Sequence, residues 1–290
     1  MEVVAIEPHG FCSGVRAAIE TARRTLSAAS PVFCLRELVH NETVLAELRS
    51  EGMRFVSSLE EVPRGAPVLF SAHGVSPKER RQAAARGLRV ADATCPFVAR
   101  AHRQMRDFAA RGVPVAVVGN VEHEEVVGLL GECDAPDGAR AVLREEDVEA
   151  LPFPEDAPVG VVCQTTLSAG TVNGVLSVLR ARYPHIEESP ASDTCTATRD
   201  RQRAVDEFVR AGEPSSTGVL VVGSARSSNT ARLAEIASSA GAKVWRVDGA
   251  EALGGCDFAG IGRLGVTAGA STPERVVRAV LDALTARSRP

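Results

Sequence analysis

The sequence predicts an α/β protein made of three pseudo-symmetric α/β units with parallel sheets. Apolar, strand-like runs alternate with helix-like stretches along the whole chain, which is typical of parallel sheets joined by helical crossovers. Polar clusters follow these runs in pairs, so that one plan occurs three times, although the residues themselves do not repeat. One cysteine stands at the start of each copy of the plan: Cys12, Cys95 and Cys195.

Six strand-like runs define the expected sheets. Each is followed by a polar cluster and then by a helix-like stretch. The clusters therefore fall at the carboxyl ends of parallel strands, where ligands collect in sheets of this class. We expect these strands at Val32 to Leu35, Val68 to Ser71, Val115 to Val118, Val159 to Cys163, Val219 to Gly223 and Leu264 to Thr267.

The unit boundaries are expected near the three cysteines. This placement gives units over residues 13–94, 95–192 and 193–290. A further apolar run, Val3 to Ile6, precedes the first cysteine, and we expect residues 1–12 to join the sheet of the third unit.

An amphipathic helix is expected behind each cysteine. A helix N-terminus favours the thiolate form of a cysteine, which is the form that ligates metal. The sequence therefore predicts a metal site shared by the three units. The apolar stripes that predict the helices are Val15, Ala18, Ile19, Ala22 and Leu26, then Val98, Ala101, Met105 and Phe108, then Val205, Phe208 and Val209.

The composition is that of an ordinary globular enzyme. The chain has 290 residues, enough for two or three domains with their own cores. Its net charge of −4 and its dispersed basic residues argue against a nucleic-acid partner. The sequence shows no apolar run of about 18 residues that would suit a membrane span, and no signal peptide follows Met1, so we expect a cytoplasmic protein.

Three thiolates from separate units can ligate three irons of a 4Fe-4S cluster and leave the apical iron open to substrate. Zinc held by three thiolates is an alternative, although the chain lacks the closely spaced cysteine pairs that structural zinc prefers. Cysteines that only pack in the core are a third reading. Four of the seven cysteines are expected to be packing residues of this kind: Cys34, Cys133, Cys163 and Cys256.

Histidines and hydroxyl residues in the polar clusters predict a pocket for a polyanion. Helix N-termini with free amides and hydroxyls bind phosphate well, although ordinary N-capping explains serines at such positions equally. The two readings are compatible. The residues concerned are His40, His73, His123, Ser227, Ser228, Asn229 and Ser271.

Glu125 is the expected proton donor. It shares a cluster with His123, and a carboxyl group enclosed in a dry pocket beside a phosphate has a raised pKa. Glu122 and Glu124 are interpreted as ordinary helix-start residues that favour the helix dipole.

These residues resemble the 4-hydroxy-3-methylbut-2-enyl diphosphate reductase family over essentially the whole chain. The resemblance rests on ordered motifs, which makes it specific. They are Gly10-Phe11-Cys12-x-Gly14-Val15, Val39-His40-Asn41, Ser71 to Ser76, Asp92-Ala93-Thr94-Cys95-Pro96, Gln164 to Ser168, Cys195-x-Ala197-Thr198, Gly223-Ser224 with Ser227-Ser228-Asn229, and Val266 to Ser271.

The resemblance implies a central 4Fe-4S cluster with three cysteine ligands, Cys12, Cys95 and Cys195, and an open apical iron. It implies the last step of the methylerythritol phosphate isoprenoid pathway. In that step (E)-4-hydroxy-3-methylbut-2-enyl diphosphate is converted to isopentenyl and dimethylallyl diphosphate, water leaves at the open iron, and two electrons arrive one at a time from a donor such as ferredoxin or flavodoxin.

The resemblance also implies roles for the clustered polar residues. Glu125 would supply the proton, and Thr165 would help to place the substrate hydroxyl. The diphosphate would bind His40, His73, His123, Ser227, Ser228, Asn229 and Ser271.

One position departs from the family pattern. The family usually has His-Pro-Glu-Val where this chain has His123-Glu124-Glu125-Val126, so that a second carboxylate replaces the proline. We expect Glu125 to keep its role, because its spacing from His123 is preserved. A second carboxylate nearby could raise the pKa of Glu125 or shift the loop.

Two other functions stay open. The first is that of quinolinate synthase, which is also built like three α/β units around a three-cysteine cluster. The set of histidines and serines in this chain argues against that function. A non-catalytic cluster or zinc protein that senses iron or oxygen is the second, and the presence of Glu125 and Thr165 argues for catalysis instead.

Overall fold

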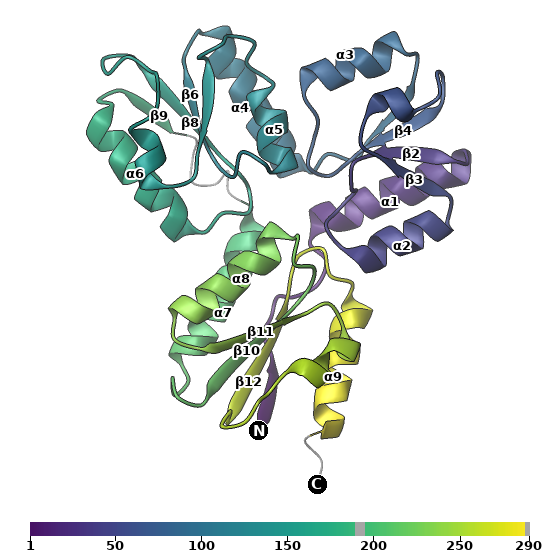
Figure 1. Cartoon of the computed structure of the whole chain (residues 1–290), viewed down its shortest axis with the longest axis vertical. Coiled ribbons are helices and arrows are strands. Elements are labelled where there is room, and N and C mark those ends of the chain that lie inside the picture. The colour runs from purple at the N-terminus through teal and green to yellow at the C-terminus, as the bar shows by residue number, and fades with distance from the viewer. Residues whose placement is uncertain (189–194, 288–290) are drawn as a thin grey trace. The chain divides into compact units, whose positions relative to one another are not determined.

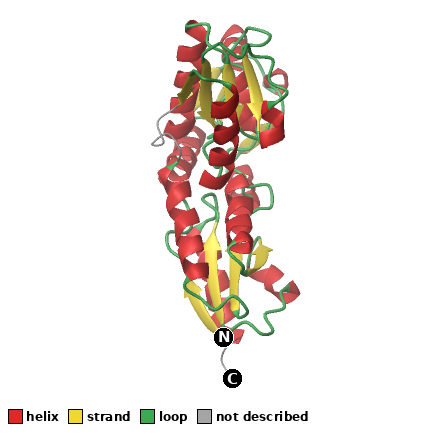
Figure 2. Cartoon of the chain, turned by 90° about the vertical axis from the view of Figure 1, so that its left-hand side faces the viewer, coloured by secondary structure: helices red, strands yellow, loops and turns green. Residues whose placement is uncertain are grey.

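The computed structural model describes residues 1–188 and 195–287 (Figure 1). Among these residues, twelve strands form three four-stranded sheets, and every strand pair is parallel. Helices alternate with strands along the chain, and Figure 2 shows helices lying beside the strands. The predicted fold class is confirmed.

The first sheet contains the strand order β3-β2-β4-β5. Its strands are β2 (Val32–Leu35), β3 (Met53–Val56), β4 (Pro67–Phe70) and β5 (Arg89–Asp92), and the helices of this part of the chain are α1 (Ser13–Ala28), α2 (Glu42–Ser50) and α3 (Pro77–Ala85).

The second sheet has the order β7-β6-β8-β9. Its strands are β6 (Val115–Val118), β7 (Ala139–Val142), β8 (Val159–Cys163) and β9 (Ile186–Glu188), and its helices are α4 (Pro96–Ala110), α5 (Glu124–Leu130) and α6 (Ala169–Arg182).

The third sheet has the order β1-β12-β10-β11. Its strands are β1 (Glu2–Ala5), β10 (Thr217–Val222), β11 (Lys243–Val247) and β12 (Arg263–Ala268), and its helices are α7 (Thr196–Arg210), α8 (Ser228–Ser239) and α9 (Glu274–Arg287).

The three sheets share one topology. In each, the first strand of the unit lies between the second and the third, and a fourth strand flanks the third. In the third sheet the fourth place is taken by β1, whose residue Val4 lies opposite Gly265 of β12. The unit boundaries near residues 13, 95 and 193 stay a prediction, and position 193 lies outside the described residues.

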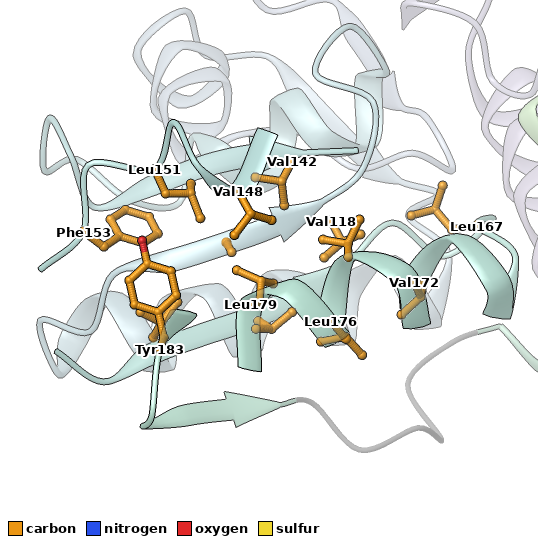
Figure 3. Close-up of a cluster of buried hydrophobic side chains, with 14 residues drawn as sticks. Val118, Val142, Val148, Leu151, Phe153, Leu167, Val172, Leu176, Leu179 and Tyr183 are labelled. Atoms are coloured by element: carbon orange, nitrogen blue, oxygen red, sulfur yellow. The ribbon is translucent and has the colours of Figure 1, made fainter. Parts of the chain in front are cut away.

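Apolar side chains fill the space between each sheet and its helices. In the second sheet, Val115 and Val117 point to the face covered by α4 and α5, while Ala116 and Val118 point to the face covered by α6. Figure 3 shows the latter core, in which Leu176 and Leu179 of α6 pack beneath the strands. Burial of both faces is the reason why the central strands read as continuous apolar runs.

By their internal contacts the residues form two compact units. One comprises residues 1–16, 40–46 and 196–290, and the other comprises residues 17–39 and 47–195. The first therefore contains the third sheet, and the second contains the first and second sheets. No helix in the described part of the chain has the length and apolar character that crossing a membrane requires.

Candidate functional site

Cys12 sits in a turn directly before α1. Its amide donates to the carbonyl of Ala270 (3.1 Å), and its Sγ accepts from the amide of Val15 (3.4 Å) at the start of the helix. Gly10 makes this turn possible, because its φ is +72° and a Cβ there would lie 2.8 Å from a carboxylate oxygen of Glu274. The turn therefore holds the Cys12 thiol at a helix N-terminus, next to the end of β12.

Cys95 stands at the N-cap of α4, followed by Pro96 in the first turn. Its amide donates to the carbonyl of Ala72 (3.0 Å), which places this cysteine beside the loop of His73. Cys195 immediately precedes α7, and the residues before it, Asp193 and Thr194, lie outside the described residues. All three cysteines are half-buried.

The other four cysteines differ from these three in position. All seven lie in the described part of the chain, and no disulfide joins any of them. Cys34 is fully buried in β2, where burial strongly raises the pKa of its thiol, so it is inert as a ligand or nucleophile. Cys133, Cys163 and Cys256 pack against the hydrophobic cores.

Arg201 is a residue whose importance the sequence did not reveal. It is buried in α7, where its guanidinium donates to the carbonyls of Ala197 (2.8 Å) and Gly10 (2.7 Å). It therefore ties the turn of Cys12 to the helix that follows Cys195. Its spacing of four from Val205 puts it on the buried stripe of α7, and a charged residue on such a stripe is the signal that could have identified it.

Replacing Arg201 with methionine is expected to lower the free energy of unfolding by about 2–3 kcal/mol, because the carbonyl of Gly10 loses a charged donor in a buried place. Thermal unfolding of the purified protein measures this change. Arg203→Ala on the exposed face of the same helix serves as the control and should have almost no effect. Equal stability of the two variants would contradict a structural role for Arg201.

Glu125 is buried at the start of α5 and accepts hydrogen bonds from Thr165, which follows the end of β8. The amide of Thr165 donates to its Oε1 (2.8 Å), and the hydroxyl of Thr165 donates to its Oε2 (3.1 Å). Burial raises the pKa of Glu125, while the hydrogen bonds from Thr165 and the charge of His73 oppose the rise. A carboxyl group with a raised pKa, bonded to a hydroxyl residue, is suited to general acid catalysis.

His123 and His73 lie next to each other near Glu125. Their rings meet edge to face, with centroids 5.6 Å apart. The amide of Glu125 donates to Nδ1 of His123 (3.2 Å), so the proton of the neutral His123 ring resides on Nε2. Nδ1 of His73 instead lies 2.9 Å from a carboxylate oxygen of Glu124 and must donate to it.

Glu124 does more than favour the helix dipole, so the interpretation of this residue as an ordinary helix-start glutamate is wrong. Its carboxylate contacts His73 and also lies 3.8 Å from Nε of Arg36. The second carboxylate is thus engaged by two basic side chains. Glu122, in contrast, is exposed.

The remaining predicted residues lie in the compact unit that holds the third sheet. The hydroxyl of Ser271 donates to the carbonyl of His40 (3.0 Å), and the preceding residue, Ala270, accepts from Cys12. His40, Ser271 and Cys12 are therefore neighbours at the carboxyl end of β12.

The N-terminus of α8 carries the other members of this set. Ser227 is the N-cap, and its Oγ accepts from the amide of Thr230 (3.3 Å). Ser228 and Asn229 follow in the first turn. Both amide atoms of Asn229 are buried without a hydrogen-bond partner in the structure, and the residue has only 4% of its surface exposed. Buried amides normally have partners, so this one is poised for a polar ligand.

The comparisons with known proteins identify the family. A family model described as LytB protein matches residues 3–285. A protein of Mycobacterium tuberculosis named 4-hydroxy-3-methylbut-2-enyl diphosphate reductase 1 is 44% identical over 97% of this chain and 85% of its own length. The enzyme of that name from Azotobacter vinelandii is 44% identical over 98% of this chain and 90% of its own length.

Solved structures agree with the sequence matches. The structure of E-1-hydroxy-2-methyl-but-2-enyl-4-diphosphate reductase from Plasmodium falciparum has a TM-score of 0.92 and is 32% identical, covering 98% of this chain and 88% of its own. A second structure is described as (E)-4-hydroxy-3-methyl-but-2-enyl diphosphate reductase, the terminal enzyme of the non-mevalonate pathway. It has a TM-score of 0.69 and is 29% identical, covering 99% of this chain and all of its own. The resemblance predicted from the motifs is confirmed, and the chain belongs to the LytB family of 4-hydroxy-3-methylbut-2-enyl diphosphate reductases.

Proposed function

We propose that this enzyme reduces (E)-4-hydroxy-3-methylbut-2-enyl diphosphate to isopentenyl and dimethylallyl diphosphate. The reaction breaks the allylic C–O bond, consumes two electrons and two protons, and releases the hydroxyl as water. The observation that carries the proposal is the buried carboxyl of Glu125, bonded twice to Thr165. This pair can hold a proton where a leaving hydroxyl needs one.

We assign separate roles in proton transfer and hydrogen bonding to Glu125, Thr165 and His123. Burial keeps a proton on Glu125 more readily than on an exposed glutamate, so the carboxyl can donate as a general acid. Thr165 orients that carboxyl and positions the substrate hydroxyl. His123, with its ring proton on Nε2, can donate a hydrogen bond to the bound substrate.

The three helix-start cysteines suit a 4Fe-4S cluster with an open apical iron. They are half-buried and outside any disulfide, and each directly precedes a helix. When bound, the cluster would supply the electrons one at a time and Lewis acidity at the open iron. Cys12, Cys95 and Cys195 are the residues that would hold it. A small ferredoxin or flavodoxin in the cytoplasm would be the donor.

The diphosphate is assigned to the hydroxyl, amide and imidazole groups at the strand ends. The first turn of α8 offers Ser227, Ser228 and Asn229 beside helix amides, an arrangement that favours anions. The orphaned amide of Asn229 supports this assignment, since its Nδ2 can donate to a phosphate oxygen. His40, His73, His123 and Ser271 complete the proposed set.

Anaerobic reconstitution with iron and sulfide tests the proposal. We expect the loaded enzyme to oxidise a reduced viologen dye only when the allylic diphosphate is added, with both C5 diphosphates as products. Two outcomes would contradict the reductase assignment and favour a sensor protein. One is a protein that binds zinc in place of iron, and the other is a cluster-loaded protein that does not react with the allylic diphosphate.

Replacing Asn229 with leucine is expected to weaken pyrophosphate binding about tenfold or more without lowering stability. The amide atoms have no partner in the structure, so an apolar side chain of similar size leaves no further group unsatisfied. Titration calorimetry with pyrophosphate and thermal unfolding measure the two effects. Ser239→Ala at the other end of α8 is the control. Loss of stability without loss of affinity would assign Asn229 a structural role only.

A further inference from the structure

His73 and three further ionisable side chains form a continuous network, and each of the four is half-buried. Glu79 Oε1 lies 2.5 Å from Nη1 of Arg36. Nε of the same guanidinium lies 3.8 Å from Oε2 of Glu124, which in turn lies 2.9 Å from Nδ1 of His73. The side chains of Arg36, Glu79 and Glu124 are each 21% exposed, and that of His73 is 14% exposed.

Arg36 adopts an unusual backbone conformation to take part in this network. It follows β2 directly, and its φ is +61°, which no other non-glycine residue shares among those that the structure describes. A positive φ is costly for a side chain with a Cβ, so the surroundings must hold the residue there. The amide of Arg36 is fixed by the carbonyl of Val56 (2.8 Å).

Glu79 anchors the far end of the network. Its Oε2 accepts from the amide (2.7 Å) and the hydroxyl (3.0 Å) of Ser76, which caps α3. Burial alone would raise the pKa of Glu79, but the hydrogen bond from Arg36 and those from Ser76 bring it below its usual value. Glu79 is therefore a fixed anion that orients Arg36.

We propose that Glu124 is a positioning residue for His73 and that Arg36 holds the Glu124 carboxylate in place. The carboxylate accepts the Nδ1 proton, so Nε2 is the ring atom that meets a phosphate oxygen of the substrate. To donate to that oxygen, Nε2 must be protonated as well, and Glu124 balances the charge of the doubly protonated ring. A proline at position 124 would offer no such carboxylate.

This inference rests on the proposed function in one respect, which is the assignment of His73 to the diphosphate. The contact between Glu124 and His73 is independent of it. The two can therefore be tested separately, with one readout for the ring and one for the anion.

The first readout is the imidazole 15N spectrum of the full-length, cluster-loaded protein labelled at histidine. Replacement of His73 by asparagine assigns its signals. We expect a protonated Nδ1 for His73 in the parent protein and a loss of this signature in both Glu124→Ala and Glu124→Pro. Arg36→Gly should weaken the signature while preserving the fold, because glycine accepts a positive φ. The exposed Glu122→Ala is the matched control and should leave the spectrum unchanged.

The second readout is the affinity for pyrophosphate, together with KM and kcat for the allylic diphosphate. Loss of the carboxylate in Glu124→Ala should weaken pyrophosphate binding and raise KM about tenfold, the lower end of what loss of a hydrogen-bonding partner costs at a metal-bound histidine, with kcat changed little. An unchanged His73 spectrum in Glu124→Ala would overturn the positioning role. So would normal pyrophosphate affinity in Glu124→Ala when His73→Asn binds weakly. If His73→Asn itself binds pyrophosphate normally, the diphosphate assignment fails while the contact between the two residues stands.

Discussion

Glutamine in place of Glu125 is expected to lower turnover by about two to four orders of magnitude while the protein keeps its fold and its cluster. Glutamine has the same shape and can still accept from the amide of Thr165, but it has no proton to give to the leaving hydroxyl. Single-turnover reduction of the allylic diphosphate under anaerobic conditions measures the effect. Glu122→Gln is the matched control. Full activity of the Glu125→Gln variant would remove Glu125 from the mechanism and direct attention to Glu124.

The same substitution has a second, pH-dependent signature. Burial raises the pKa of Glu125 in the folded protein, so the folded state binds this proton more tightly than the unfolded state does. The contribution of Glu125 to stability is therefore most favourable below its unfolded pKa of about 4.3 and declines as pH rises toward the raised folded value. As pH rises from acidic to neutral, the stability of the Glu125→Gln variant should therefore increase relative to that of the parent. Thermal unfolding of both proteins across this range gives the difference, and a flat difference would contradict the raised pKa.

Serine in place of Cys95 is expected to abolish reduction of the allylic diphosphate and most of the bound cluster. Serine is a poor ligand for the soft iron sites of such clusters, and Cys95 is the residue at the N-cap of α4 whose thiol would be lost. If the parent carries the proposed 4Fe-4S cluster, iron and acid-labile sulfide should fall from about four of each per chain to a small fraction. Visible absorbance after anaerobic reconstitution reports the same loss.

The control for this prediction is Cys256→Ser, since Cys256 packs against the core of the third sheet. It should retain iron, sulfide and activity. Equal losses in Cys95→Ser and Cys256→Ser would mean that the assay reports general instability. A full complement of iron in Cys95→Ser would exclude Cys95 as a ligand.

The central strands could be predicted from the sequence because burial on both faces makes them continuously apolar. Val32–Leu35, Val115–Val118 and Val159–Cys163 coincide with the predicted runs, and each of the other three central strands differs from its predicted run by one or two residues at each end. The flanking strands β3, β5, β7, β9 and β11 lie outside these predicted runs. Arg246 of β11 and Arg140 of β7, for example, interrupt the apolar pattern because one face of each strand reaches solvent.

Candidate residues could be predicted where their position depends only on the strand that precedes them. Thr165 follows β8 and Ser271 follows β12, and both stand at the carboxyl ends of buried strands. Partners could not be predicted in this way. The contact of Glu124 with His73 and the bond from Arg201 to Gly10 join segments that are distant in sequence, and periodicity carries no information on such pairs.

The place of β1 in the third sheet sets the order in which the enzyme can be completed. β1 pairs with β12, and the amide of Cys12 bonds to Ala270, so the first thiol reaches its final setting only after the ribosome has made nearly the whole chain. The segment around Cys95, whose amide bonds to the carbonyl of Ala72, is complete much earlier in synthesis. If Cys12 ligates the proposed cluster, its thiol would reach its final place only after the closure of a loop that spans nearly the whole chain, late in folding.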